Sequence, residues 1–82
     1  MAEVLLSEQA REWLDDQQSD ISQRVTKKLH QAGDYPEHVL EPLRGMPEYK
    51  LRIGEYRVII EWRKADDELR VQKIGHRKNI YR

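Results

Sequence analysis

The second half of the chain holds a set of side chains suited to breaking a phosphodiester bond of RNA. Internal transesterification needs a base near the 2′-hydroxyl, cations around the phosphorane-like transition state and an acid for the leaving 5′-oxygen. Arginine can hold phosphate through two parallel N–H groups, and lysine adds a point charge. A tyrosine is a weak base at its ordinary pKa of about 10, but neighbouring cations would lower that pKa. The residues of these types that we consider together are Lys50, Arg52, Arg57, Arg77 and Tyr81.

Three of these cations fall on a predicted β-hairpin. Residues 49–53 alternate between apolar and cationic side chains, which places the cations on one face of a sheet. Gly54-Glu55 is predicted to be a two-residue turn that needs glycine first, and this turn would place Arg52 opposite Arg57. A like-charge pair of this kind destabilises a sheet by about a few tenths of a kcal/mol. Folding does not require this pair. A basic patch on a rigid hairpin is what a protein needs to hold a polyanion, and RNA is the first candidate.

The charge of the chain is divided between its two halves. The formal net charge is zero. Residues 1–43 hold four Lys and Arg against nine Asp and Glu, a net charge of −5. Residues 44–82 hold eleven Lys and Arg against six Asp and Glu, a net charge of +5. We therefore expect a positive field around the half that carries the candidate residues.

Composition argues against several kinds of site. The chain has no cysteine, which excludes disulfides and thiolate metal sites. Its three histidines, His30, His38 and His76, are scattered without metal-ligand spacing, which leaves metal-free chemistry without a cofactor. His76 lies beside a predicted strand end and is open to two interpretations, an acid or base of the site or a packing or surface residue.

Length and hydropathy predict one cytoplasmic domain over residues 1–82. A chain of 82 residues is too short for two hydrophobic cores. The longest apolar runs, such as Val58–Ile60, have only a few residues, so we expect no membrane segment. The first residues lack the charged-then-apolar pattern of a signal peptide.

The predicted fold class is α+β: an N-terminal strand, a two-helix hairpin and a three-stranded antiparallel sheet. Residues 4–6 are apolar and predict the first strand, and Ser7 is a suitable N-cap for a helix through about Asp15. The second helix is expected to be capped by Ser19 or Asp20 and to end at a left-handed Gly33.

The rest of the chain is predicted to be a loop, three strands and a polar tail. Residues 34–47 contain all three prolines and predict a connecting loop over the surface. The strands are expected at residues 49–53, 56–62 and 68–75. In the last strand Lys73 and Ile74 break the alternation, which predicts a bulge or an early strand end.

Two segments closely resemble the RelE branch of the RelE/ParE toxin superfamily. They are LRGMPEYKLRIGEYRVIIEW, residues 43–62, and IGHRKNIYR, residues 74–82. The resemblance implies a compact fold similar to small microbial ribonucleases. It implies the toxin of a type II toxin-antitoxin system, an mRNA interferase that enters the ribosomal A site, cleaves mRNA without metal to a 2′,3′-cyclic phosphate and inhibits translation. It also implies a RelB-type antitoxin partner, commonly in a heterotetramer.

The same resemblance implies a role for each candidate. Lys50 and Arg52 match positions that bind phosphate and help the base. Arg57 and Arg77 match positions that stabilise the transition state, and Arg77 is also a candidate for aiding the leaving group. Tyr81 matches the general base. The residues expected to contact RNA are Lys50, Arg52, Arg57, Arg77 and Lys78.

Two other functions remain open at this point. A ParE-type toxin shares the fold but poisons DNA gyrase and keeps no RNA-cleaving set, and the five candidate residues weigh against it. The second of these functions is that of a catalytically inactive homologue that only binds an antitoxin.

Overall fold

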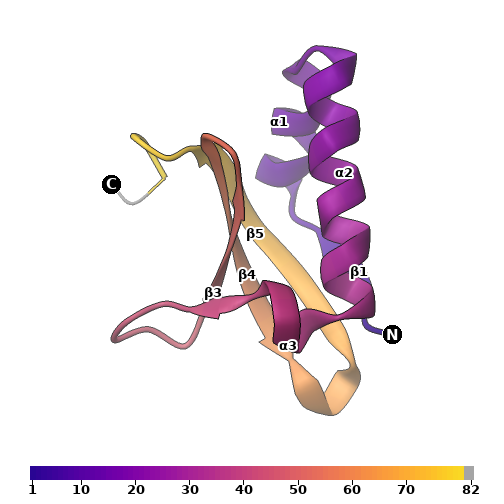
Figure 1. The fold of residues 1–82 in the computed structure, drawn as a ribbon, viewed down its shortest axis with the longest axis vertical. Coiled ribbons are helices and arrows are strands. Elements are labelled where there is room, and N and C mark those ends of the chain that lie inside the picture. Colours follow the sequence, from indigo (N-terminus) through magenta and orange to yellow (C-terminus); the bar gives the residue numbers. More distant parts are fainter. Residues whose placement is uncertain (81–82) are drawn as a thin grey trace.

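A five-stranded mixed sheet with two helices on one face forms the protein in the computed structural model, which describes residues 1–80 (Figure 1). The sheet order is β1-β5-β4-β3-β2, with β1 parallel to β5 and the other neighbours antiparallel. This confirms the predicted α+β class. The strands are β1 (Glu3–Leu6), β2 (Glu41–Pro42), β3 (Tyr49–Ile53), β4 (Tyr56–Arg63) and β5 (Glu68–His76), and the helices are α1 (Glu8–Asp16), α2 (Ser19–Asp34) and α3 (Pro36–Val39).

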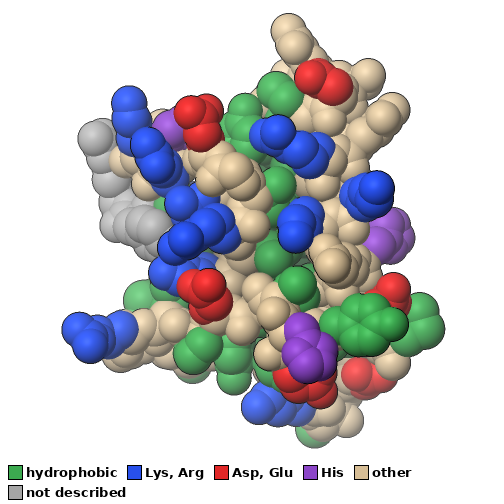
Figure 2. Space-filling model, in the orientation of Figure 1, with side chains coloured by type: hydrophobic (Ala, Val, Ile, Leu, Met, Phe, Trp, Pro, Cys, Tyr) green, Lys and Arg blue, Asp and Glu red, His purple; other side chains and the backbone are tan. Residues whose placement is uncertain are grey.

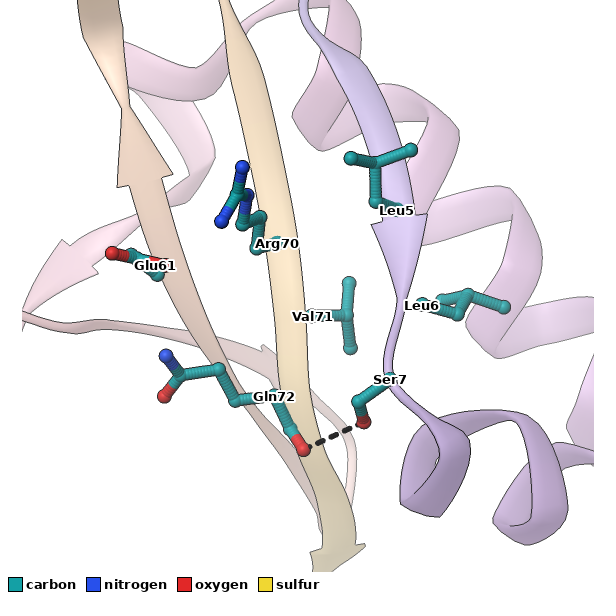
Figure 3. Close-up of a pocket in the computed structure, with 7 residues that line it drawn as sticks. All are labelled: Leu5, Leu6, Ser7, Glu61, Arg70, Val71 and Gln72. Atoms are coloured by element: carbon teal, nitrogen blue, oxygen red, sulfur yellow. Dashed lines mark hydrogen bonds between the residues drawn. The ribbon is translucent and has the colours of Figure 1, made fainter. Parts of the chain in front are cut away.

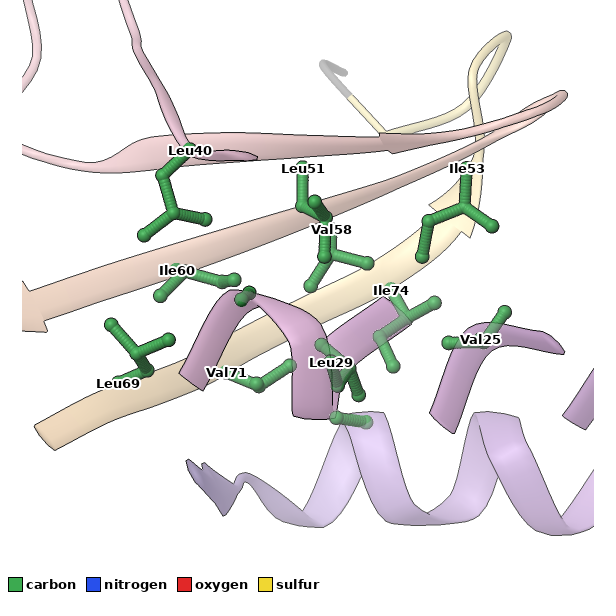
Figure 4. Packing of buried hydrophobic residues seen from close by; sticks show 12 residues of the cluster. Val25, Leu29, Leu40, Leu51, Ile53, Val58, Ile60, Leu69, Val71 and Ile74 are labelled. Atoms are coloured by element: carbon green, nitrogen blue, oxygen red, sulfur yellow. The ribbon is translucent and has the colours of Figure 1, made fainter. Parts of the chain in front are cut away.

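The core lies between the sheet and the two long helices (Figure 4). Alternate residues of β3, β4 and β5 point toward the helices, as the period-two pattern predicts. Within residues 1–80, no helix is long and apolar enough to cross a membrane. The buried apolar residues of the cluster include Val25, Leu29, Leu51, Ile53, Val58, Ile60, Leu69, Val71 and Ile74.

The first helix begins as predicted, whereas the second differs at both ends. The Ser7 side chain accepts a hydrogen bond from the Ala10 N–H at 3.1 Å and caps α1. Helix α2 begins at Ser19 after Gln18, whose side chain makes no capping bond. Gly33 was expected to be left-handed, but it lies buried inside α2, which ends at Asp34 with Tyr35 as its C-cap.

Gly33 has a packing role in place of the predicted helix-ending one. Its carbonyl accepts a hydrogen bond from the Ala2 N–H at 2.7 Å. A Cβ at Gly33 would lie 2.9 Å from the Ala2 carbonyl oxygen and 3.1 Å from Val4 Cγ2. The glycine therefore allows α2 to approach the start of β1.

The proline-rich segment is more regular than the surface loop predicted for residues 34–47. It contains α3, with Pro36 in the first turn, and β2, which adds a fifth strand. Glu41 pairs with Lys50 and Pro42 with Tyr49. Pro36 suits a helix start because its φ is fixed, and Pro42 is tolerated because β2 is an edge strand.

The bulge predicted in β5 is present and sets the phase of the strand's last residues. Ile60 pairs with Val71 but Ile59 pairs with Lys73, so Gln72 is the extra residue. The strand continues through Gly75 to His76, so the alternative of an early strand end is wrong. An extra residue moves every following side chain to the opposite face. Ile74 and His76 therefore point toward the helices, whereas Gly75 points away.

Helix α1 supports the bulged part of β5 through Gln9. Its Nε2 donates to the Ile74 carbonyl and its Oε1 accepts from the Ile74 N–H, both at 3.0 Å. These two bonds replace a strand partner, because β1 has ended at Leu6. We expect Gln9→Ala to lower the free energy of unfolding by about 1–3 kcal/mol, since it leaves both backbone groups of Ile74 without their side-chain partner.

Urea titration measures this loss, with Gln23→Ala as the control. Gln23 is an exposed glutamine on α2, and its removal should change stability by less than about 0.5 kcal/mol. Equal stabilities of the two variants would show that the Gln9 bonds do not support β5.

Candidate active site

The face of the sheet turned away from the helices carries the predicted cations. Lys50 and Arg52 alternate with buried residues of β3, and Arg57 does so on β4. Arg52 lies directly opposite Arg57, as predicted from the turn. Gly54 has a φ of 57°, a conformation that favours glycine. Lys and Arg side chains gather beside this hairpin in Figure 2.

The chain after β5 brings Arg77 to the same end of the hairpin. The Arg77 N–H donates to the Glu55 carbonyl at 2.8 Å, which extends the pairing to the turn. Gly75 is opposite Arg57, so by alternation Arg77 follows on the Arg57 side of the sheet. The described chain ends on the side of the sheet away from α1 and α2 (Figure 1). We call Lys50, Arg52, Arg57 and Arg77 the cationic patch, and exposed Lys78 follows Arg77 in the chain.

Arg57 is the most firmly held member of the cationic patch. Its Nη1 donates to the Gly54 carbonyl at 2.7 Å and to the Tyr56 carbonyl at 2.8 Å. The guanidinium has five N–H donors, and these bonds use only one of its nitrogen atoms. The side chain is therefore fixed against the turn while donors remain for a phosphate.

The other cations are less constrained. Lys50 Nζ lies 3.6 Å from Glu41 Oε2, and more than half of the Glu41 side chain is exposed. An exposed ion pair of this kind adds only about 0–1 kcal/mol, so a phosphate can replace the carboxylate at low cost. Arg52, Arg77 and Lys78 are exposed.

The structure does not bring His76 together with the cationic patch. The bulge at Gln72 turns its side chain toward the helix side, where its ring lies 6.0 Å from the Tyr56 ring in an edge-to-face arrangement. Its Nε2 is 3.8 Å from Glu55 Oε2, and its Nδ1 accepts a hydrogen bond from the Lys78 N–H at 3.2 Å.

The predicted base, Tyr81, lies outside the described residues, but the residue before it does not. Ile80 is buried with 4% of its surface exposed. A Cβ at Gly75 would lie 3.3 Å from Ile80 Cδ1, so Ile80 packs over Gly75 on the Arg57 side of the sheet. Sequence reasoning did not assign this pair. The available signals were one apolar residue in a polar tail and a glycine within a strand.

A separate hollow of about 270 Å³ lies where β1 and β5 meet (Figure 3). Two of its charged residues have partners nearby: Glu61 with Arg63 at 3.4 Å and Arg70 with Glu68 at 3.2 Å. Hydrogen bonding to Asp66 and the charge of Glu61 raise the pKa of Arg63. None of the predicted site residues lines the hollow, whose lining is Leu5, Leu6, Ser7, Glu61, Arg70, Val71 and Gln72.

The arrangement supports chemistry by charged side chains. Across residues 1–80, no group of three or more His, Cys, Asp or Glu side chains is placed to hold a metal ion. A fixed guanidinium with other cations on the same face can bind successive phosphates and stabilise charge that develops on one of them.

Solved structures with the same fold include toxins in complex with antitoxins. The toxin-antitoxin complex RelBE2 from Mycobacterium tuberculosis matches with a TM-score of 0.84 and 22% identity, over 93% of this chain and 98% of that chain. The archaeal RelE-RelB complex from Pyrococcus horikoshii OT3 gives 0.80 and 21%, over 95% and 97%. The intact RelBE toxin-antitoxin complex of E. coli gives 0.78 and 26%, over 93% and 96%.

Comparison by sequence identifies the family. No curated protein matches the chain. Residues 4–81 match the family model described as the ParE toxin of the type II toxin-antitoxin system parDE. Since that match spans nearly the whole chain, the protein belongs to the ParE toxin family of type II toxin-antitoxin systems, within the RelE/ParE superfamily.

Proposed function

We propose that this toxin is a metal-independent endoribonuclease that acts in the cytoplasm and cleaves mRNA in the ribosomal A site. The observation that carries the proposal is the cationic patch, in which Arg57 is fixed at the hairpin turn and Arg77 is brought to the same end. The similarity in fold to RelE toxins supports an RNA substrate for this patch.

The proposed reaction is an internal transesterification. Tyr81 removes the proton from the 2′-hydroxyl, and the 2′-oxygen attacks the adjacent phosphorus. The bond from phosphorus to the 5′-oxygen breaks, and the leaving oxygen takes a proton from water, which gives a 2′,3′-cyclic phosphate and a 5′-hydroxyl. Arg57 stabilises the charge on the phosphorane-like transition state, and Arg77 assists the leaving oxygen.

The remaining cations bind the RNA strand, and the ribosome presents it. Lys50, Arg52 and Lys78 contact phosphates beside the reacting one. The affinity for free RNA is expected to be low, because the chain as a whole has no net charge. Delivery of the mRNA in the A site compensates for that weak binding.

The proposed partner is a RelB-type antitoxin, in a heterotetramer. Structures similar to this chain are RelE toxins solved with RelB antitoxins. An antitoxin that covers the cationic patch would block RNA binding.

Ribosomes stalled on a defined mRNA test the proposal. We expect the purified toxin to cut the A-site codon of the ribosome-bound message and to leave the same message intact when it is free, as read by primer extension. A 2′-deoxynucleotide at the cleaved position should abolish cutting, because the nucleophile is missing. Cutting that survives this replacement would rule out transesterification.

The family description favours one alternative, a ParE-type poison of DNA gyrase. A gyrase assay that traps cleaved DNA distinguishes the two functions. DNA breaks that depend on the toxin, together with intact mRNA on stalled ribosomes, would replace the ribonuclease proposal with this one.

A further inference from the structure

Three of the four backbone N–H groups of residues 77–80 donate to one residue, His76. Its carbonyl accepts hydrogen bonds from the Asn79 N–H at 2.8 Å and from the Ile80 N–H at 3.1 Å. Its ring Nδ1 accepts the Lys78 N–H at 3.2 Å. With the bond from Arg77 to the Glu55 carbonyl, every N–H from residue 77 to residue 80 has a partner. We call residues 77–80 the tail.

A side-chain contact adds to these hydrogen bonds. Ile80 is buried and packs over Gly75, which is directly opposite Arg57 in the sheet. Ile80 is outside the main core cluster, so its burial is a local contact that fastens the tail to the patch side of the sheet. Because Gly75 has no side chain, Ile80 can lie against the sheet there.

We propose that His76 and Ile80 are positioning residues that clamp the tail beside Arg57, and that His76 is not an acid or base of the reaction. The proposal rests on the proposed function in one respect, that Tyr81 is the base. Ile80 is bonded directly to Tyr81, so fixing Ile80 limits where the phenol can reach relative to Arg57.

The bonds of the His76 ring account for its two nitrogens. Nδ1 accepts the Lys78 N–H, and the ring tautomer that fits this bond has its N–H at Nε2. That Nε2 is 3.8 Å from Glu55 Oε2, and the ring is on the helix side with Tyr56. The ring therefore lies on the side of the sheet opposite to a phosphodiester bound beside Arg57.

Two substitutions of His76 separate positioning from proton transfer. In His76→Asn the amide oxygen can take the place of Nδ1 and accept the Lys78 N–H, but it cannot transfer a proton. In His76→Ala both functions are lost. We expect single-turnover cleavage on ribosomes to stay within about threefold of wild type for His76→Asn and to fall by roughly 10²-fold for His76→Ala, as a misplaced catalytic group implies.

Either of two other results would overturn the proposal. Loss of cleavage in His76→Asn as large as in His76→Ala would make His76 an acid or base. Full activity in both variants would show that the ring does not position the tail.

Amide hydrogen exchange in the free protein tests the clamp without any cleavage assay. We expect Ile80→Ala and His76→Ala to speed exchange at Arg77 and Asn79 by about tenfold, as the loss of a local contact implies. Exchange at the core residue Val58 should not change, and Ile80→Leu should restore protection. Unchanged exchange in the tail would refute the clamp even in a toxin that cuts mRNA. If the wild-type toxin does not cut mRNA but the variants change exchange as expected, the proposed function is refuted and the clamp remains supported.

Discussion

Arg57→Ala is expected to lower single-turnover mRNA cleavage on ribosomes by roughly 10²–10³-fold, the usual cost of removing a preorganised donor to a developing charge. The expectation follows from how the side chain is held. Nη1 is bound to the Gly54 and Tyr56 carbonyls, so the guanidinium needs little ordering when the transition state forms. Arg57→Lys keeps the charge but loses the planar fork, and it should recover only a small part of the rate.

Arg70→Ala provides the matched control for charge and location. Arg70 is an exposed arginine of β5 that lies opposite Glu61 of β4, on the same face as Arg57 but toward the other end of the two strands. Its loss should change cleavage by less than about threefold, as expected for a peripheral phosphate contact or for none. An equal loss of rate in both variants would mean that only the total charge of this face matters.

The Arg57 side chain also stabilises the hairpin turn, so the free energy of unfolding is measured in parallel with cleavage. Removing its bonds to two carbonyls is expected to cost about 1.5–3 kcal/mol of unfolding free energy. Cleavage by Arg57→Ala, Arg70→Ala and the wild type is therefore compared at a temperature where thermal melts show all three proteins folded. A folded Arg57→Ala toxin with wild-type cleavage would exclude Arg57 from the transition state.

The part of the fold that carries the cationic patch follows from local rules that a sequence displays. Alternation in residues 49–53 assigns the faces of β3, and Gly54 supplies the turn conformation that puts Arg52 opposite Arg57. Ser7 caps α1 for an equally local reason, because its side chain reaches an N–H three residues ahead.

Elements that depend on distant partners are not visible in this way. Strand β2 has two residues and exists through its pairing with β3. Gly33 is needed because Ala2, which is far away in sequence, approaches α2. Neither requirement leaves a pattern in the neighbouring residues, so a glycine near a helix end is interpreted as its terminator and a proline-rich segment as a loop.

The bulge at Gln72 explains why the site was predicted only in part. Counting in steps of two from Leu69 would put residues 71, 73 and 75 toward the helices and His76 on the face of Arg57. The extra residue reverses this order, so Gly75 points toward the patch side and His76 toward Tyr56. The irregular pattern at Lys73 and Ile74 predicts that the phase changes, but it does not say at which residue.

Tyr81→Phe is expected to reduce single-turnover cleavage by roughly 10²–10⁴-fold, the range that a general base contributes. The change removes only the phenolic oxygen and leaves the aromatic ring, so any stacking of the ring against a nucleobase should persist. Binding to stalled ribosomes should therefore stay near the wild-type level while the chemical step slows. A rate within about threefold of wild type would exclude Tyr81 as the base, since a contribution of that size is below the range of proton transfer.

Two further variants identify the loss as catalytic. Tyr35→Phe removes a hydroxyl from an exposed tyrosine at the start of α3, beside His38, and should leave cleavage unchanged. The double variant Arg57→Ala with Tyr81→Phe tests whether both groups act in one step. If base and guanidinium serve the same transition state, removing the second should cost much less than it does alone, because groups that act as a unit are not additive. Multiplicative losses would instead assign them to separate steps, with Arg57 acting in RNA binding and Tyr81 in chemistry.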